Sequence, residues 1–271
     1  MRARPLVTLL TDFGARDPFV GAMKGVILGL CRDATIVDLC HEVPAYDIAG
    51  GSFLLSTGTS AFPAGTIHVA VVDPGVGSAR RPILAELDDQ VFVAPDNGLL
   101  SYVVASAERR RLRHLAARQY WRPSISPSFH GRDIFAPVAG HLAAGVAPER
   151  FGPEIDDPLC LEIARPAKDP AGSLRGTVVW VDRFGNCITN VSRRDLDAFT
   201  SITTGGGIRV HVGGRPLGVL VDHFAGVTPG QTGAILGSTG YVELFCNQGD
   251  LARQWRLGRG DPVLLEATTR A

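Results

Sequence analysis

Residues 5–40, PLVTLLTDFGARDPFVGAMKGVILGLCRDATIVDLC, decide the fold of this chain. The stretch opens with a short β-rich apolar run at residues 5–13 and closes with another at residues 35–40. Between them, residues 18–31 have helical spacing, and Pro18 falls in the first turn, where a missing N–H costs nothing. A strand, a helix and a second strand in this order predict a parallel sheet that is covered by helices.

The same alternation continues to about residue 163. Further strands are predicted at residues 66–73 and 90–96, and further helices at residues 48–62 and 134–145. We therefore predict an α/β fold for the first part of the chain, an N-terminal α/β/α sandwich with a mostly parallel sheet over residues 1–168.

A second domain is predicted after a linker. Residues 164–176, ARPAKDPAGSLRG, combine prolines, glycines and mixed charge, which is the composition of a connecting segment. Seven short apolar runs with Gly or Asp turns follow it: GTVVWVD, NCITNVS, IRVHVGG, GVLVDHF, GAILGS, GYVELF and DPVLLEA. This rhythm predicts a smaller all-β, barrel-like domain over residues 169–271.

Composition excludes several classes of function. The chain is 45% hydrophobic, and Lys+Arg and Asp+Glu both total 27, so no basic surplus indicates binding to nucleic acid. No stretch approaches the roughly 18 uninterrupted apolar residues of a membrane span, and the first residues lack the apolar core of a signal peptide. We therefore expect a cytoplasmic protein whose partner is a small molecule. The five scattered cysteines are interpreted as structural thiols.

Acidic side chains follow the C-terminal ends of four predicted strands: Asp12, Asp38, Asp73 and Asp96. Ligands of open parallel sheets bind at this edge, so we predict a site there. Asp12 is suited to accept hydrogen bonds from a ribose diol. Asp17 has two open interpretations, because it is either a ligand-binding carboxylate or the N-cap of the helix that Pro18 opens.

A glycine turn lies within residues 66–81, TIHVAVVDPGVGSARR. It superficially resembles the glycine loop of dinucleotide-binding folds, but an arginine replaces the third glycine and a strand-like RPILAEL follows. No helix N-terminus is therefore offered to a phosphate. The glycines are interpreted as residues that let the backbone turn sharply and so bring Asp73 and Arg80 together. This pair serves either the chemistry or an ordinary salt bridge.

Two further motifs carry polar groups suited to a site. In residues 128–145, SFHGRDIFAPVAGHLAAG, His130 lies in a loop ahead of a helix, and Asp133 is interpreted as the N-cap of that helix. Residues 178–190, VVWVDRFGNCITN, combine the carboxylate of Asp182, the ring of Phe184 and the amide of Asn186. Such groups can bind a purine by stacking and edge hydrogen bonds, or they form only a hairpin turn.

Together these segments closely resemble the family of S-adenosylmethionine hydroxide adenosyltransferases, relatives of the bacterial fluorinase and chlorinase. The resemblance covers nearly the whole chain, in LTDFG..DPFVG.MKGVI, HEVPAYDI, VVDPGVGS.RR, APDNGLLS, FHGRDIFAP, VDRFGN.ITN and GSTGY.E...NQG. It implies an N-terminal α/β/α domain and a C-terminal β-barrel-like domain. It also implies a homotrimer with active sites between the N-domain of one subunit and the C-domain of its neighbour.

The resemblance also implies a reaction, in which water attacks the 5′ carbon of S-adenosyl-L-methionine and releases adenosine and methionine. An Asp, an Arg and a His that act on water mark the hydrolase branch, and they match Asp73, Arg80 and His130. The halogenating branch has aromatic residues at the positions matching Asp73 and His130, so this pattern favours water over halide. Because a sulfonium is already an activated leaving group, we expect no metal and no cofactor.

Several residues match substrate ligands of the family. Asp12 resembles the ribose ligand, and Tyr46 flanks the sugar. Asp17 and Asp182 resemble the carboxylates that hold the methionine ammonium, while Ser238 resembles the serine that holds its carboxylate. In halogenase-like members of the family an arginine comes directly after this serine, whereas here the next residue is Thr239. The adenine pocket is matched by Phe184, Asn186, Phe224, Glu243 and the stretch Cys246, Asn247 and Gln248.

Three alternatives remain open at this point. The first is a halogenase that makes a 5′-halo-5′-deoxyadenosine. The second is a metal-dependent hydrolase, since two-metal sites are built from the types of residue found at Asp12, His41, Asp73, Asp96, Asn97 and His130. Its sequence signal is weak, because no local ligand pair such as HExxH is present. The third is a sensor that binds the same nucleoside without turnover.

Overall fold

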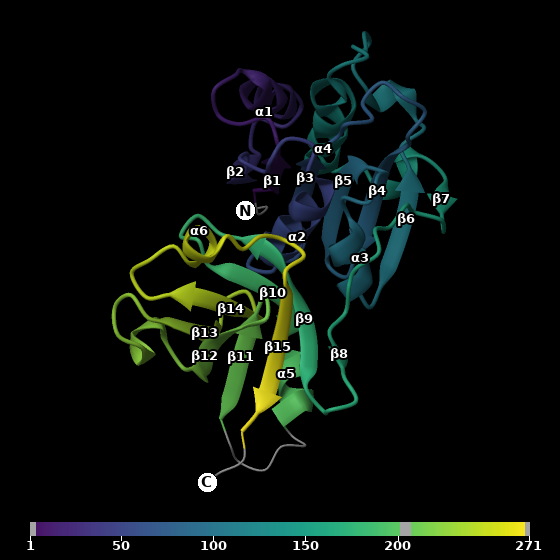
Figure 1. Ribbon diagram of the computed structural model, residues 1–271. Helices are drawn as coiled ribbons and strands as arrows, with labels where there is room; N and C mark the ends of the chain where they lie inside the picture. The colour runs from purple at the N-terminus through teal and green to yellow at the C-terminus, as the bar shows by residue number, and fades with distance from the viewer. Residues whose placement is uncertain (1–3, 201–206, 269–271) are drawn as a thin grey trace. The chain divides into compact units, whose positions relative to one another are not determined.

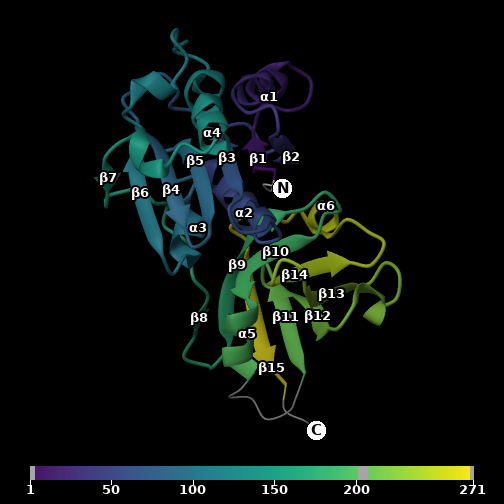
Figure 2. The same ribbon diagram turned by 180° about the vertical axis from the view of Figure 1, so that it is seen from behind.

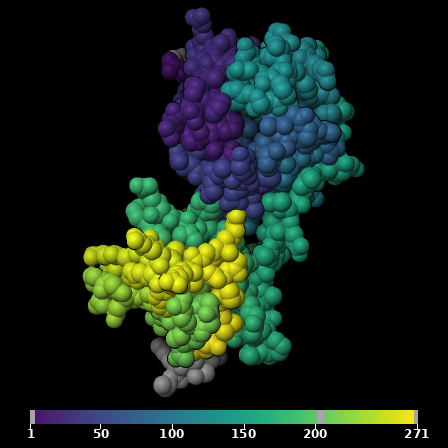
Figure 3. All heavy atoms as spheres, turned by 45° about the horizontal axis from the view of Figure 1, so that its top comes forward, coloured from purple at the N-terminus to yellow at the C-terminus, as the bar shows by residue number. Residues whose placement is uncertain are grey.

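The computed structural model describes residues 4–200 and 207–268. The chain divides into two compact units, residues 1–163 and 164–271, and the boundary predicted from the sequence after residue 168 lies a few residues further on. Figure 3 shows one face of the molecule as spheres, with the N-terminal unit in purple to teal and the C-terminal unit in green to yellow. Within the described ranges, no helix combines the length and the apolar character that crossing a membrane would require.

A seven-stranded sheet forms the centre of the N-terminal unit, in the order β2-β1-β3-β5-β4-β6-β7. Its parallel half consists of β1 (Leu6–Thr11), β2 (Thr35–Cys40), β3 (Ile67–Val71) and β5 (Gln90–Pro95). These four strands coincide with the predicted ones. Their C-terminal ends meet at one edge, and Asp12, Asp73 and Asp96 follow strand ends there as predicted, whereas Asp38 lies inside β2.

The other half of this sheet is antiparallel, so the sheet is mixed and the expectation of a mostly parallel sheet was too simple. It consists of β4 (Pro82–Leu87), β6 (Arg110–His114) and β7 (Glu154–Ile155). A two-residue turn joins β4 to β5, and Asp88 in that turn has a φ of 52°. So short a connection permits only antiparallel pairing.

Helices cover both faces of the sheet, which confirms the α/β/α sandwich (Figures 1 and 2). One face packs against α1 (Phe19–Leu30) and α4 (Ala136–Ala143), through side chains such as Met23 and Val138. The other face packs against α2 (Ile48–Thr59) and α3 (Ser101–Ser106), through Leu55 and Val103. The short 3-10 turns η1 (Arg118–Tyr120) and η3 (Pro148–Phe151) complete the unit.

The predicted helix cap Asp133 is wrong, and of the two open interpretations of Asp17 the N-cap one does not hold. Pro18, not Asp17, occupies the N-cap position of α1, and no side chain caps that helix. A π-helical turn, η2 (Gly131–Phe135), precedes α4 and contains Asp133, so this residue lies inside the turn and His130 occupies the N-cap position. Turns of this kind are frequent at functional sites.

The C-terminal unit is a closed barrel of seven strands, as the sequence predicts. The strands are β9 (Leu174–Val181), β10 (Cys187–Ser192), β11 (Ile208–Val212), β12 (Arg215–Val221), β13 (Thr232–Leu236), β14 (Tyr241–Cys246) and β15 (Pro262–Ala267). Pairing of β10 with both β14 and β9 closes the barrel, and the two-residue β8 (Ala167–Lys168) extends its rim. Short helical segments lie between strands, α5 (Arg193–Thr200), η4 (Phe224–Gly226) and α6 (Leu251–Trp255).

Candidate active site

Asp73 and Arg80 form a buried ion pair beyond the end of β3. Arg80 Nε donates to Asp73 Oδ1 at 3.0 Å, and Arg80 Nη2 donates to Oδ2. The two side chains are only 4% and 9% exposed. A bidentate contact between a guanidinium and a carboxylate fixes both position and orientation, so the predicted proximity of these residues is confirmed and the arginine is held rigidly.

The glycine turn between them makes this contact possible. A Cβ on Gly75 would lie 3.5 Å from Arg80 Cγ and 3.8 Å from Asp73 Oδ1, so the turn folds directly beneath the pair. Gly77 has a φ of 80°, and a Cβ there would lie 2.4 Å from the carbonyl oxygen of Pro127. Only glycine fits this position, because both the backbone conformation and the close approach exclude a side chain.

His130 joins the pair from the start of η2. Arg80 Nη2 lies 2.8 Å from His130 Nδ1. A guanidinium can only donate, so Nδ1 accepts and the neutral ring carries its proton on Nε2. Burial and, next, the positive charge of Arg80 lower the pKa of His130, against smaller opposing effects of Asp73 and Asp133. The imidazole is therefore neutral at pH 7 and presents Nε2–H as a donor.

Aromatic and apolar groups surround this cluster. The Arg80 guanidinium lies 5.2 Å from the centroid of the Phe135 ring, within the range of a cation–π contact. Phe129, which precedes His130, packs edge to face with Phe13 and Phe19 at centroid distances of 5.9 and 5.2 Å. In such surroundings water competes weakly, so the three polar groups interact more strongly than they would on an open surface.

Asp12 and Tyr46 lie together at the same strand edge. The backbone N–H of Tyr46 donates to Asp12 Oδ2 at 2.9 Å, while the Tyr46 side chain is exposed and its φ is 68°. A bulky residue with a positive φ is uncommon outside functional turns. Asp17 is exposed in the turn before α1 and does not contact the Asp73–Arg80–His130 cluster in any described interaction.

Sequence reasoning missed a polar network that supports the segment bearing Asp12. His41 Nδ1 lies 2.9 Å from Thr11 Oγ1, and His41 Nε2 lies 3.0 Å from Asp38 Oδ1. Lys24 Nζ donates to Asp38 at 2.6 Å. Thr11 ends β1, and His41 directly follows Cys40, the last residue of the neighbouring parallel strand β2. These two positions in the sequence could have indicated the contact between Thr11 and His41.

Two residues of the metal-site alternative, Asp96 and Asn97, are engaged in structural contacts. Asp96 accepts from Arg81 and from the N–H of Leu159, and the Asn97 side chain donates to the carbonyl of Val72. Among the described residues, no group of three or more His, Cys, Asp or Glu side chains is arranged to hold a metal ion.

In the C-terminal unit, Asp182 organises the turn between β9 and β10. Its carboxylate accepts from the N–H groups of Phe184 and Asn186, both at 2.8 Å, and from Asn186 Nδ2 at 2.9 Å. The Phe184 ring is 74% exposed. The hairpin interpretation is therefore confirmed, and the same turn displays an aromatic ring beside a rigid amide, as the purine-binding interpretation requires.

Glu243 lies under the neighbouring turn. A Cβ on Gly237 would lie 1.9 Å from Glu243 Oε1, so the buried carboxyl group rests against the backbone next to Ser238. Burial and, next, the charge of Asp182 raise the pKa of Glu243, against a hydrogen bond from Thr239. Glu243 and Asp182 are therefore close enough to interact, whereas Ser238 is exposed.

The remaining predicted adenine ligands are held by contacts within the barrel. Phe224 is partly exposed and packs on Phe245 at a centroid distance of 4.8 Å. Cys246 is buried, and Asn247 Nδ2 donates to the carbonyl of Val227 at 2.7 Å. The Cys246 and Asn247 side chains serve the barrel itself, and the Asn247 N–H and carbonyl are also paired within it, with Gln231 and Gly230.

Comparison with known proteins agrees with this geometry. The chain is 38% identical to an (R)-S-adenosyl-L-methionine hydrolase of Thermus thermophilus, over 96% of this chain and 98% of that protein. It is 35% identical to one of Salinispora tropica, over 98% and 100%. A fluorinase of Nocardia brasiliensis is 28% identical over 96% of both chains. The crystal structure of a conserved Thermotoga maritima protein superposes with a TM-score of 0.89 at 33% identity, covering 96% of this chain and 99% of that one.

The two units correspond to two known domains. The N-terminal domain of the SAM hydroxide adenosyltransferases matches residues 7–152, and their C-terminal domain matches residues 176–264. The chain therefore belongs to the SAM hydroxide adenosyltransferase family.

Proposed function

We propose that this protein hydrolyses S-adenosyl-L-methionine to adenosine and L-methionine. The observation that carries the proposal is the Asp73–Arg80–His130 cluster, in which a carboxylate, a guanidinium and a neutral imidazole are already in contact. Relatives that are 35–38% identical over nearly the full chain, and that are named (R)-S-adenosyl-L-methionine hydrolase, support it.

In the proposed reaction, the chain's residues position one water molecule behind the 5′ carbon. His130 Nε2–H holds the water oxygen, Arg80 stabilises the negative charge that develops on it, and Asp73 fixes the orientation of Arg80. The water gives up one proton to bulk solvent as it attacks, so its oxygen has hydroxide character. The new O–C5′ bond forms as the C5′–S bond breaks, and the electron pair of that bond stays on the methionine sulfur. Positioning of this kind is worth about 7–11 kcal/mol when the attack is in line.

The substrate contacts are part of the same proposal. Asp12 and Tyr46 bind the ribose, Asp17 and Asp182 bind the methionine ammonium, and Ser238 binds its carboxylate. The adenine contacts are Phe184, Asn186, Phe224, Glu243 and the backbone at Cys246 and Asn247. The exposed ring of Phe184 supports this assignment, because stacking on a base would cover it.

We also propose that the protein acts in the cytoplasm as a homotrimer, without a metal or a cofactor. Each substrate would contact the N-terminal domain of one subunit and the C-terminal domain of another. The family resemblance motivates this assembly, and it fits the presence of ligand-type residues in both units.

The test is to incubate the purified protein with S-adenosyl-L-methionine, with and without chloride and EDTA, and to identify the nucleoside by mass spectrometry. We expect adenosine and methionine in equal amounts under all conditions. Formation of 5′-chloro-5′-deoxyadenosine would indicate a halogenase, loss of turnover in EDTA a metal enzyme, and binding without turnover a sensor. Light scattering on the same sample should give three times the chain mass of 28.8 kDa.

A further inference from the structure

Asp133 is a fully buried carboxylate beside the proposed catalytic cluster, and the reaction does not use it. It lies in η2, three residues after His130, and its exposed fraction is 0%. Burial raises the pKa of Asp133, but hydrogen bonds from Arg132 and from the Ser126 N–H outweigh burial and lower the pKa below its ordinary value. The group is therefore ionised, and a buried ionised group needs a complete set of donors.

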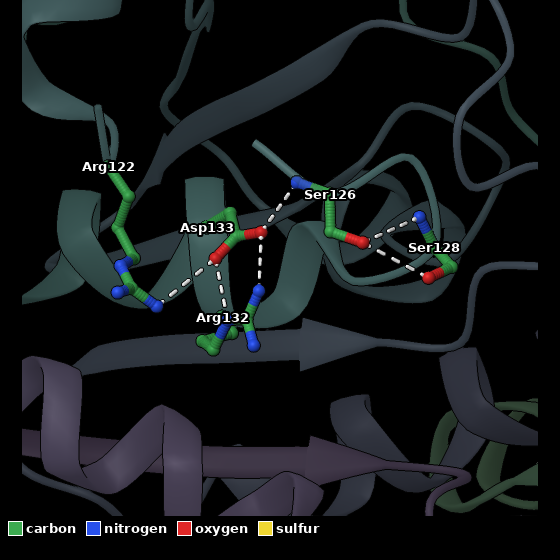
Figure 4. Close-up of polar contacts among 5 residues, drawn as sticks. All are labelled: Arg122, Ser126, Ser128, Arg132 and Asp133. Carbon is green, nitrogen blue, oxygen red and sulfur yellow. Dashed lines mark hydrogen bonds and ion pairs between the residues drawn. The ribbon is translucent and has the colours of Figure 1, made fainter. Parts of the chain in front are cut away.

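Two of these donors, Arg122 and Ser126, come from loop 122–130, and the third, Arg132, comes from the turn η2 that follows the loop (Figure 4). Asp133 Oδ2 accepts from the Ser126 N–H at 2.8 Å, and Arg132 Nε donates to Oδ1 at 2.6 Å. Arg122 lies 3.5 Å from Oδ1, and its backbone N–H donates to the carbonyl of Asp133 at 2.9 Å. Asp133 thus connects Arg122, at the start of the loop, and Ser126, in its middle, to the turn η2 that follows the loop.

The same loop contacts two members of the cluster, His130 and the turn that carries Arg80. Its last residue is His130, which accepts from Arg80. Within the loop, Ser126 Oγ accepts from the N–H of Ser128 at 3.3 Å, which orders the backbone on both sides of Pro127. The Pro127 carbonyl in turn lies directly against Gly77, in the turn that carries Arg80. Displacement of this loop would therefore move the histidine and release the arginine turn together.

We propose that Asp133 is a positioning residue of the site, which anchors loop 122–130 so that His130 and Arg80 keep their mutual contact. The kinetic part of this inference rests on the proposed hydrolysis. Asp133 touches neither water nor substrate in this scheme, so its loss changes the geometry of the cluster rather than its composition.

The test compares Asp133→Asn with a matched control, Asp169→Asn. The Asp169 side chain is 9% exposed, accepts from an arginine, Arg175, and from a backbone N–H, that of Ser173, and lies in the C-terminal unit, outside the cluster. An asparagine at either position keeps the size of the side chain but cannot accept from all the donors. The readouts are kcat, KM and the pKa of His130, measured by NMR titration with His130→Ala to assign the signal.

For Asp133→Asn we expect kcat to fall by about tenfold to a hundredfold, the scale of a misplaced catalytic group, with KM within about twofold. We expect the pKa of His130 to rise toward its ordinary value of 6.5, because the burial that lowers it is lost when the loop loosens. Asp169→Asn should leave kcat and the pKa of His130 unchanged. Fold integrity is checked by circular dichroism.

Two results would overturn the inference: an unchanged kcat in a folded Asp133→Asn protein, or a pKa of His130 that falls. A fall would mean that Asp133 acts only through its charge while the loop stays in place. If Asp133→Asn does not fold, Arg132→Gln removes two of the donors from a partly exposed residue and should change both readouts in the same direction, by less. The NMR titration requires no turnover, so it tests the anchor even if the protein does not hydrolyse S-adenosyl-L-methionine.

Discussion

The Asp73–Arg80–His130 cluster of the N-terminal unit and the 182–186 turn of the C-terminal unit are prepared for a ligand in different ways. In the cluster the polar side chains contact one another, and those of Asp73 and Arg80 are nearly inaccessible to solvent. In the turn the polar groups are also paired, through Asp182, but the Phe184 ring projects into solvent. The comparison indicates that the groups proposed for chemistry are preorganised, whereas the groups proposed for recognition gain most of their contacts from the substrate.

The largest expected effect is on kcat, from truncating the cluster. Arg80→Ala and His130→Ala should each lower kcat by at least about a hundredfold, the scale of acid–base groups, and change KM little. Arg80→Lys should restore little of the loss, because an ammonium cannot replace the planar fork that contacts Asp73 and His130 together. Steady-state kinetics with circular dichroism as a folding control measure this. Full activity in either alanine variant would remove the proposed roles.

A smaller effect, on KM, is expected from the recognition turn. Phe184→Ala should raise KM by about tenfold, since stacking on a base is worth about 1–3 kcal/mol, and should leave kcat nearly unchanged. Phe224→Ala serves as the comparison and should raise KM by less. The Phe224 ring already packs on Phe245, so less of its surface is available to contact a base. If Phe184→Ala lowered kcat as strongly as Arg80→Ala does, the division between chemistry and recognition would be wrong.

The two halves of the N-terminal sheet differ in how far the sequence predicts them. The parallel strands are apolar runs separated by helical spacing, so pattern alone locates them. Strand β6, RRLRH, shows no alternation of apolar and polar residues, since one of its buried positions is an arginine, Arg113. The charge of Arg113 is balanced by contacts with Glu86, Glu149 and Glu154. These carboxylates come from three other segments, and pairing at such separations leaves no local pattern.

The candidate site shows the same limit. Asp73 and Arg80 are seven residues apart around a glycine turn, so their proximity follows from local backbone reasoning. His130 is fifty residues further along the chain, and only the family resemblance joined it to them. The N-cap predictions for Asp17 and Asp133 failed because capping preference was applied without knowing that Pro18 and a π-helical turn displace the helix starts. Side-chain preference is a weak guide where the backbone is irregular.

The smallest expected effect is the dependence of kcat/KM on pH near neutrality. It again distinguishes the Asp73–Arg80–His130 cluster from the 182–186 turn. Because burial and Arg80 lower the pKa of His130 below 6.5, the imidazole stays neutral at pH 7 and accepts from Arg80. The value of kcat/KM should therefore be constant above pH 6.5 and fall below it, approaching about tenfold per pH unit once His130 is protonated. An acid limb centred above pH 6.5 would contradict a partly buried His130 that is neutral at pH 7.

Acid also acts on the fold, so the kinetic limb needs a stability control. Burial lowers the pKa of His68 to about 4, while its ordinary value is 6.5. Between these values the unfolded chain binds a proton that the folded chain does not, so the stability contributed above pH 6.5 is lost as the pH falls toward 4. Circular dichroism at each pH identifies this loss. A decrease in kcat while the protein remains folded then belongs to the Asp73–Arg80–His130 cluster, and a change confined to KM belongs to the groups that bind the substrate.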